Sequence, residues 1–191
     1  MSTTITSGMV GVALLIAAAP SALPAQAITP GPLRHAEITF AMKVTKVADF
    51  VGRVDSVRAE FSGTSLANVT GWVEMQLRDM RTGIGGRDTH MRNVMRADSF
   101  PTIRFALAGV DVGVSSGDSV AVVLRGDLSI HGVTRAVRVP GHVIVRGCEV
   151  DVAASFPIDM REYGIVPPSR FFGALKVDPI AGVGVRLTFG G

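Results

Sequence analysis

The sequence predicts an all-β protein, an eight-stranded antiparallel barrel with one short helix, and three observations support this. Apolar and polar residues alternate over about eight short runs, as expected for strands with one dry face and one wet face. Clusters of Gly, Ser and Asp separate the runs at the spacing of turns. Helical periodicity is scarce, so the strands have to bury their apolar rows against one another, as they do in a sandwich or barrel.

The expected strands follow one another from residue 38 to residue 189. They cover residues 38–44, 51–61, 72–77, 103–112, 120–130, 136–145, 150–158 and 183–189. Gly52 lies inside the second run, where we expect a bend or bulge. The one helix is expected over Ile84–Met95, with Thr82 capping its start. Its Gly85-Gly86 pair costs roughly 2 kcal/mol of helix propensity against Ala, so we expect it to be short and held by packing.

The first 27 residues have the pattern of a secretory signal peptide. Residues 8–19 are apolar but too short to span a bilayer, and Ala25-Gln-Ala27 supplies a cleavage site between small residues. We therefore expect residues 1–27 to be removed and residues 28–191 to form one domain in the periplasm or outside the cell. Residues 1–7 contain no Lys or Arg, so an uncleaved anchor remains the alternative.

Composition argues against several classes of function. The arginines behind the net charge of +3 alternate with apolar residues along strands and do not cluster with aromatics, which disfavours nucleic-acid binding. The lone Cys148 cannot form an intrachain disulfide. The four histidines lack the spacing of metal ligands, and no nucleophile motif is present. We expect no enzyme activity, no metal and no cofactor.

Two blocks of sequence carry a family resemblance. The first is the predicted hairpin Leu124–Arg135, which ends Leu-Ser-Ile-His-Gly-Val-Thr-Arg, and the second is Asp79–Arg92 with its Arg-Asp-Thr-His-Met-Arg segment. The second is followed by Ala97–Phe105, and a weaker third block is Ile158–Ile165. In this order they resemble the YceI-like, polyisoprenoid-binding, lipocalin-like periplasmic proteins, from about residue 37 to the C-terminus.

The resemblance implies a lipocalin-like barrel that holds a long isoprenoid or fatty chain along its axis. The residue types agree, because an eight-stranded barrel either fills with side chains or leaves room for one slender ligand. With 22 Gly, one Trp and one Tyr, the inner rows are built mainly from Val, Ala, Leu and Met. The alternative is a filled barrel that works as a non-enzymatic periplasmic stress or interaction module through its Arg-rich outside.

Candidate binding residues fall into three sets. The residues expected to contact the tail of the ligand are Phe40, Met42, Trp72, Phe105, Leu124 and Leu128. Arg87 and His90, three apart on the expected helix, are the candidates for its head group, unless Asp88 pairs with a neighbouring arginine and the segment only closes the barrel. His131 either donates a hydrogen bond to the ligand or to a loop carbonyl, or satisfies backbone groups that the Gly132 turn leaves open.

The expected partner is a polyisoprenoid, quinone, fatty amide or other long-chain lipid. Each methylene removed from water contributes roughly 0.8 kcal/mol, so a long tail supplies affinity without any catalytic group. We expect a monomer or homodimer. The sequence leaves transient contact with a membrane open.

Overall fold

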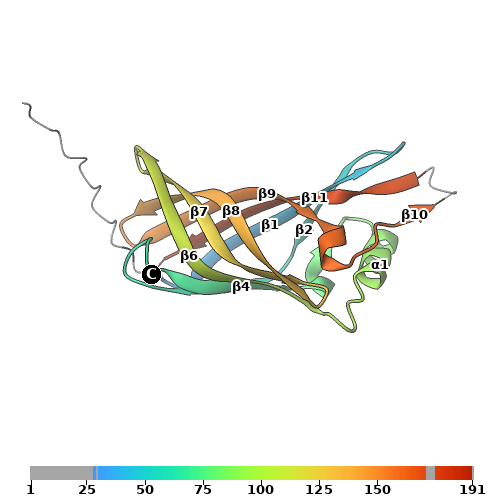
Figure 1. Ribbon diagram of the computed structural model, residues 1–191, viewed down its shortest axis with the longest axis horizontal. Coiled ribbons are helices and arrows are strands. Elements are labelled where there is room, and N and C mark those ends of the chain that lie inside the picture. Colours follow the sequence, from blue (N-terminus) through green and yellow to red (C-terminus); the bar gives the residue numbers. More distant parts are fainter. Residues whose placement is uncertain (1–27, 29, 171–174, 191) are drawn as a thin grey trace, which may run out of the picture.

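The computed structural model describes residues 28, 30–170 and 175–190, and its main feature is a long, curled antiparallel sheet (Figure 1). The expected signal peptide therefore lies outside the described residues. The strands are β1 Leu33–Val44, β2 Phe50–Val54, β3 Val57–Ser62, β4 Thr70–Gln76, β5 Met80–Arg81, β6 Thr102–Ser116, β7 Ser119–Ile130, β8 Val133–Arg146, β9 Glu149–Asp159, β10 Ser169–Arg170 and β11 Leu175–Phe189. Three helical segments join them: η1 Leu77–Asp79, α1 Gly85–Val94 and η2 Met160–Tyr163.

The sheet curls round on itself, and one bent segment, β2 with β3, connects the two ends of the strand order. The strand order is β3-β4-β6-β7-β8-β9-β11-β1-β2-β5, and every pairing is antiparallel. Only Asp55 and Ser56 separate β2, which pairs with β1, from β3, which pairs with β4. Counted as one bent strand, they leave eight principal strands, with β5 and β10 as two-residue additions. The predicted fold class is confirmed.

Side chains alternate between an apolar interior and a charged outside. In β1 the buried residues are Ile38, Phe40 and Met42, each separated by a more exposed neighbour. The alternation changes phase in β6, where the pairing with β7 is irregular between Leu107 and Gly109. Both Leu107 and Val110 are buried as a result, because the extra residue turns the strand by one position.

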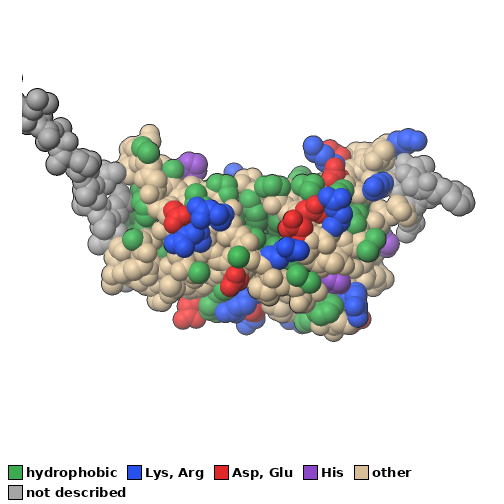
Figure 2. Space-filling view, in the orientation of Figure 1, with side chains coloured by type: hydrophobic (Ala, Val, Ile, Leu, Met, Phe, Trp, Pro, Cys, Tyr) green, Lys and Arg blue, Asp and Glu red, His purple; other side chains and the backbone are tan. Residues whose placement is uncertain are grey.

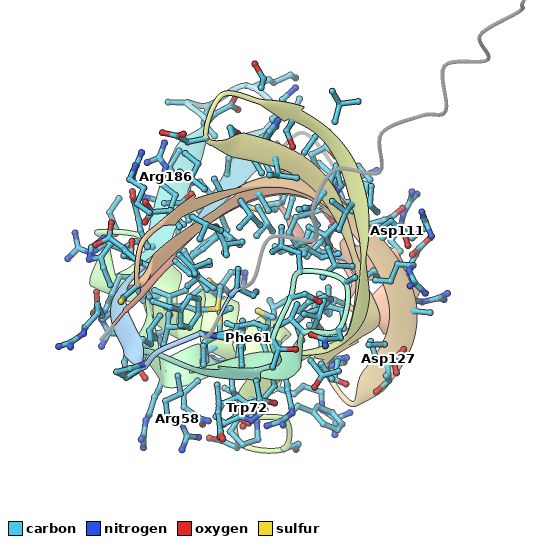
Figure 3. The ribbon with its side chains drawn as sticks, turned by 90° about the vertical axis from the view of Figure 1, so that its left-hand side faces the viewer. Arg58, Phe61, Trp72, Asp111, Asp127 and Arg186 are labelled. Carbon is cyan, nitrogen blue, oxygen red and sulfur yellow. The ribbon has the colours of Figure 1, made fainter. Side chains whose placement is uncertain are left out.

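Ion pairs cover the outside of the barrel wall. Asp111 accepts from Arg125 Nε at 2.8 Å and from Arg138 at 2.7 Å, and these guanidinium groups, Arg138 first, hold the pKa of its carboxyl below the ordinary value. The side chains of Arg58, Arg186, Asp111 and Asp127 extend outward from the ring of strands (Figure 3). Exposed pairs of this kind contribute about 0–1 kcal/mol each, so the interior carries the stability.

Two local expectations are wrong. Gly52 does not mark the bend, which lies at Asp55 and Ser56; instead a Cβ at position 52 would stand 2.1 Å from Cζ of Phe40, so glycine makes room for that ring. Thr82 does not cap α1, which begins after Ile84 without a side-chain cap. Instead, the hydroxyl and the backbone N–H of Thr82 both donate hydrogen bonds to the carboxylate of Asp88 in α1.

Candidate ligand cavity

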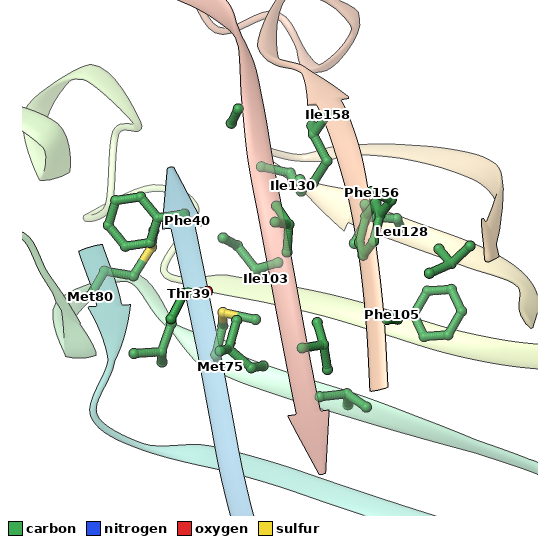
Figure 4. Close-up of a pocket in the computed structure, with 18 of the residues that line it drawn as sticks. Thr39, Phe40, Met75, Met80, Ile103, Phe105, Leu128, Ile130, Phe156 and Ile158 are labelled. Carbon is green, nitrogen blue, oxygen red and sulfur yellow. The ribbon is translucent and has the colours of Figure 1, made fainter. Parts of the chain in front are cut away.

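The interior of the barrel is not filled. An apolar cavity of about 470 Å³ extends along it, lined by inward-facing residues from all the principal strands (Figure 4). Phe40, Phe105, Leu128 and Phe156 stand among the side chains at its wall. Phe105 is only half-buried although it points inward, which places part of its ring against empty space. A cavity of this size and lining suits an apolar guest.

One end of the cavity is closed by tightly packed side chains. Ile28, Leu66 and Val69 all line it there, and each is less than a tenth exposed. Phe189 is 2% exposed, and its ring meets that of Phe61 edge-on with centroids 5.2 Å apart. A ligand therefore cannot enter between the β3–β4 loop and the end of β11 without unpacking this cluster.

The other end carries the most exposed of the lining residues. Val47 and Ala48 in the β1–β2 turn are exposed, and Phe50, Met91 and Pro168 are half-buried, yet all five line the cavity. They come from the β1–β2 turn, the start of β2, α1 and the segment before β10, which lie together at one end of the molecule (Figure 1). We call this end the mouth.

The guanidinium group of Arg87, in α1, is held at the mouth by contacts with Phe50 and Thr82. The guanidinium carbon of Arg87 lies 4.0 Å from the centroid of the Phe50 ring, and its Nε donates to the Thr82 hydroxyl at 3.1 Å. Thr82 in turn donates from its backbone N–H to Asp88 at 2.7 Å. The pKa of Asp88 is lowered from its ordinary value, chiefly by the hydrogen bond from the Thr82 hydroxyl. This bonded group fixes Arg87 at the cavity wall, whereas His90 on the next turn is exposed.

Tyr163 places a second polar group beside the cavity. It is 2% exposed and lines the interior where η2 crosses the barrel end. Burial raises the pKa of its phenol, so the hydroxyl stays protonated at neutral pH and can donate a hydrogen bond.

The β7–β8 turn fastens η2 in place. His131 and Gly132 both have positive φ, 53° and 77°, as a two-residue hairpin turn requires. Nδ1 of His131 lies 3.1 Å from the carbonyl oxygen of Tyr163, and a carbonyl only accepts, so this nitrogen carries the proton. Arg135 donates from Nε to the carbonyl of Glu162 at 2.7 Å. The His-Gly-Val-Thr-Arg sequence therefore holds the segment that carries Tyr163 by two hydrogen bonds, from His131 and Arg135, which we call the clamp.

Comparison with known sequences agrees with this architecture. The family model for the YceI-like domain matches residues 31–189. The chain belongs to the YceI-like family. A UPF0312 protein of Shewanella denitrificans is 25% identical over 169 residues, which cover 83% of this chain and 85% of that protein. A UPF0312 protein of Shewanella sp. W3-18-1 is 28% identical over 145 residues, covering 74% of this chain and 73% of that one.

Solved structures show the same fold at low sequence identity. BcnA of Burkholderia cenocepacia superimposes with a TM-score of 0.68 at 14% identity, covering 80% of this chain and 95% of that protein. A polyisoprenoid binding domain from Saccharophagus degradans, implicated in plant cell wall breakdown, gives 0.64 at 15% identity, covering 81% and 93%. The YceI-like barrel is thus conserved in shape where few residues are shared.

The YceI-like cavity brings together seven of the nine residues chosen from sequence. Those at its wall are Phe40, Met42, Arg87, His90, Phe105, Leu124 and Leu128. Trp72 is a correction: its side chain lies on the outer face, with Arg104 4.5 Å from the centroid of its ring. Its neighbours Val73 and Met75 face inward, and alternation along β4 places Trp72 on the other side.

His131 also lies away from the lining residues. It packs edge-on against Phe100, with ring centroids 4.9 Å apart, and donates to a loop carbonyl, that of Tyr163 in η2, rather than to backbone groups of its own turn. Sequence reasoning missed Tyr163 and the lining rows of β9 and β11. The rows were detectable, because Val152, Ala154, Phe156 and Ile158 alternate with more polar or smaller residues.

Other kinds of site are not formed by the part of the chain that the structure describes. No group of three or more His, Cys, Asp or Glu side chains is placed to hold a metal ion there. Among the same residues, no helix is both long enough and apolar enough to cross a membrane.

Proposed function

We propose that this chain binds a long-chain apolar ligand, such as a polyisoprenoid, quinone or fatty amide, with its tail in the cavity. The observation that carries the proposal is the unfilled apolar interior, closed at one end by Phe61 and Phe189 and open at the other. About ten buried methylenes supply roughly 8 kcal/mol, which corresponds to micromolar affinity before ordering costs. The solved domain from Saccharophagus degradans described as polyisoprenoid-binding supports the ligand class.

The head group would stay at the mouth. Arg87 is the cation held at the wall there, and the phenol of Tyr163, which lines the same cavity, can donate a hydrogen bond. A phosphate or carboxylate pairs with the guanidinium, whereas a carbonyl oxygen accepts from the phenol. The two positions therefore suit a ligand with one small polar end. No part of this binding needs a catalytic group, and it serves either transport or storage.

A matched pair of tryptophan variants tests the proposal. Leu124 lines the cavity, and Val123, its neighbour on β7, faces outward by alternation. Leu124→Trp fills the interior, so displacement of a fluorescent fatty acid should be lost, whereas Val123→Trp should bind it like the parent. Circular dichroism checks that both variants fold. Equal uptake by both variants, or no uptake by the folded parent, would contradict an internal binding site.

The ligand itself is identified from protein isolated from its own membrane-containing source. Native mass spectrometry should show a mass excess that organic extraction removes, and the extract should contain a long-chain lipid. The same spectrum tests the proposed export, because the mature chain should begin at Ile28 if residues 1–27 are a cleaved signal peptide. A clean mass without extractable lipid would count against the carrier function.

A further inference from the structure

The cations without an acidic partner are unevenly distributed over the molecule. Eleven ion pairs join Arg to Asp or Glu in the described part of the chain, and no Lys takes part in any of them. The chain has only three lysines: Lys43, Lys46 and Lys176. All three are exposed.

The three lysines gather on one projection at the mouth. Lys43 and Lys46 lie at the end of β1 and in the following turn, and Lys176 lies at the start of β11. These segments are hydrogen-bonded to each other, since the Thr45 N–H donates to the carbonyl of Lys176 at 3.0 Å and Val44 pairs with Val177. Figure 1 shows β1 and β11 extending side by side past the rest of the wall, and Figure 2 shows basic side chains at this end.

More unpaired arginines lie on the other side of the mouth. Arg92 and Arg96, in and just after α1, form no ion pair within the described residues. The nearby acids are Asp49, Asp88, Asp98, Glu162 and Asp178; Asp88 is buried and accepts from Thr82, Glu162 pairs with Arg135, and Asp49 and Asp178 accept backbone N–H bonds within their own turns. The cations at the mouth, Arg87 included, outnumber these acids. On the barrel wall, by contrast, most arginines are matched with carboxylates.

Exposed valines accompany these cations. Val47 in the β1–β2 turn is 52% exposed, and Val166 in the segment after η2 is 80% exposed. Exposure of valine alone is not specific, because Val114 in the far half of β6 is also 80% exposed. What distinguishes the mouth is that aliphatic side chains, unpaired cations and the opening of the cavity occur together. A surface of anionic phospholipids presents the complementary charge and accepts aliphatic groups.

The geometry points to the mouth as a docking surface for an anionic lipid bilayer, with Lys43, Lys46 and Lys176 facing the phosphates. This inference rests on the proposed function, because it explains how an apolar chain reaches the cavity. A tail that crossed water would expose every methylene, whereas a mouth seated on the bilayer lets the tail pass directly from lipid to protein. The closed end offers no such path.

Vesicle flotation with a matched charge control tests the docking. The parent should float with phosphatidylglycerol-containing vesicles and not with pure phosphatidylcholine vesicles, and added salt should release it. Changing Lys43, Lys46 and Lys176 together to Gln should weaken this binding about a hundredfold, given the usual contribution of a cation near such a surface. The control changes Arg58, Arg146 and Arg186 to Gln, which removes the same net charge from the wall and should leave flotation nearly unchanged.

A second pair of variants tests the apolar part of the contact. Val166→Ser should weaken flotation roughly tenfold or less, and Val114→Ser, at a site equally exposed but far from the mouth, should not change it. The inference is overturned if the parent ignores anionic vesicles or if both triple variants lose binding equally. It is also overturned if a soluble polyanion such as heparin binds the parent as tightly as the vesicles do.

A separate readout keeps the docking and the proposed function apart. Uptake of the fluorescent fatty acid from vesicle-free solution should be the same in the lysine variant and the parent, because the cavity is unaltered. A protein that takes up the probe but does not bind vesicles retains its proposed function and loses the docking surface. A protein that binds vesicles but takes up no probe retains the docking surface and loses the proposed function.

Discussion

At the end of the barrel that carries Phe189, this buried ring packs edge-on against half-buried Phe61, and the aliphatic side chains of Ile28, Leu66 and Val69 are almost fully buried. At the mouth, lining residues from the turns and from α1 are half-buried or exposed. The same strands run to both ends, so the difference in burial arises from the loops and helical segments that flank the strands at each end. One end is built for stability, and the other leaves apolar surface accessible at a cost in stability. This division is expected where a protein must open without unfolding.

The largest expected effect is on the free energy of unfolding when the closed end is hollowed. Phe189→Ala removes a ring that is 2% exposed and should cost about 3–5 kcal/mol. Phe50→Ala, at the half-buried mouth, should cost about 1 kcal/mol but release Arg87 from its contact with the ring. Urea denaturation measures both. Equal destabilisation by the two variants would show that the ends do not differ in this way.

The second prediction concerns the anchoring of α1 in acid. Because the folded pKa of Asp88 lies below its ordinary value of 3.8, its carboxylate stabilises α1 above that pH, and this contribution is lost as the pH falls through the folded pKa. Hydrogen exchange of residues 85–94 should therefore be constant from pH 7 to about pH 4, after correction for intrinsic rates, and accelerate below it.

Asp88→Asn is the control for that acid step. The amide keeps an acceptor for Thr82 but loses the charge, so it should cost about 2 kcal/mol at neutral pH. Exchange in α1 should then no longer accelerate at low pH. Asp111 and Asp159 also have lowered pKa values, but they lie outside α1 and should affect global stability alone. An unchanged acid step in Asp88→Asn would assign it to another group.

The smallest effect is expected at the clamp between the β7–β8 turn and η2. His131→Ala loses the bond to the Tyr163 carbonyl and places alanine at positive φ, which together should cost about 1–2 kcal/mol. His131→Asn should stay within about 0.5 kcal/mol of the parent, because Asn tolerates this backbone and its amide nitrogen replaces Nδ1. It also removes Nε2, which is buried without a partner in the described structure. Thermal unfolding of the two variants side by side measures the difference.

The sequence predicted the fold because its strands are long and strictly alternating. The inward row Phe40 and Met42 and the inward residues of β7 follow directly from that period. The same rule places Trp72 on the outer face, since Val73 and Met75 occupy the inner one, so the prediction of Trp72 as a tail contact was wrong. Where the period itself changes, at the irregular pairing after Leu107, no local signal predicted the change of face.

The mouth was harder to predict than the wall. Val47, Ala48 and Pro168 lie in turns and connections, where no periodicity assigns a side chain to a face. η2, which carries Tyr163 to the cavity, is bonded to His131 and Arg135, a contact between segments about thirty residues apart. The bond from Thr82 to Asp88 likewise reverses the usual direction of helix capping. Tertiary contacts decide each of these positions.

The close packing of the Phe40 ring against Gly52 has a consequence for how the cavity can differ between barrels of this shape. The ring rests where position 52 has no side chain, with only 2.1 Å between Cζ and the place a methyl group would take. Alanine there would push the aromatic ring toward the axis and narrow the bore, although residue 52 itself lies on the neighbouring strand. The width of the cavity is thus adjustable from beneath the Phe40 ring, by a change as small as one carbon.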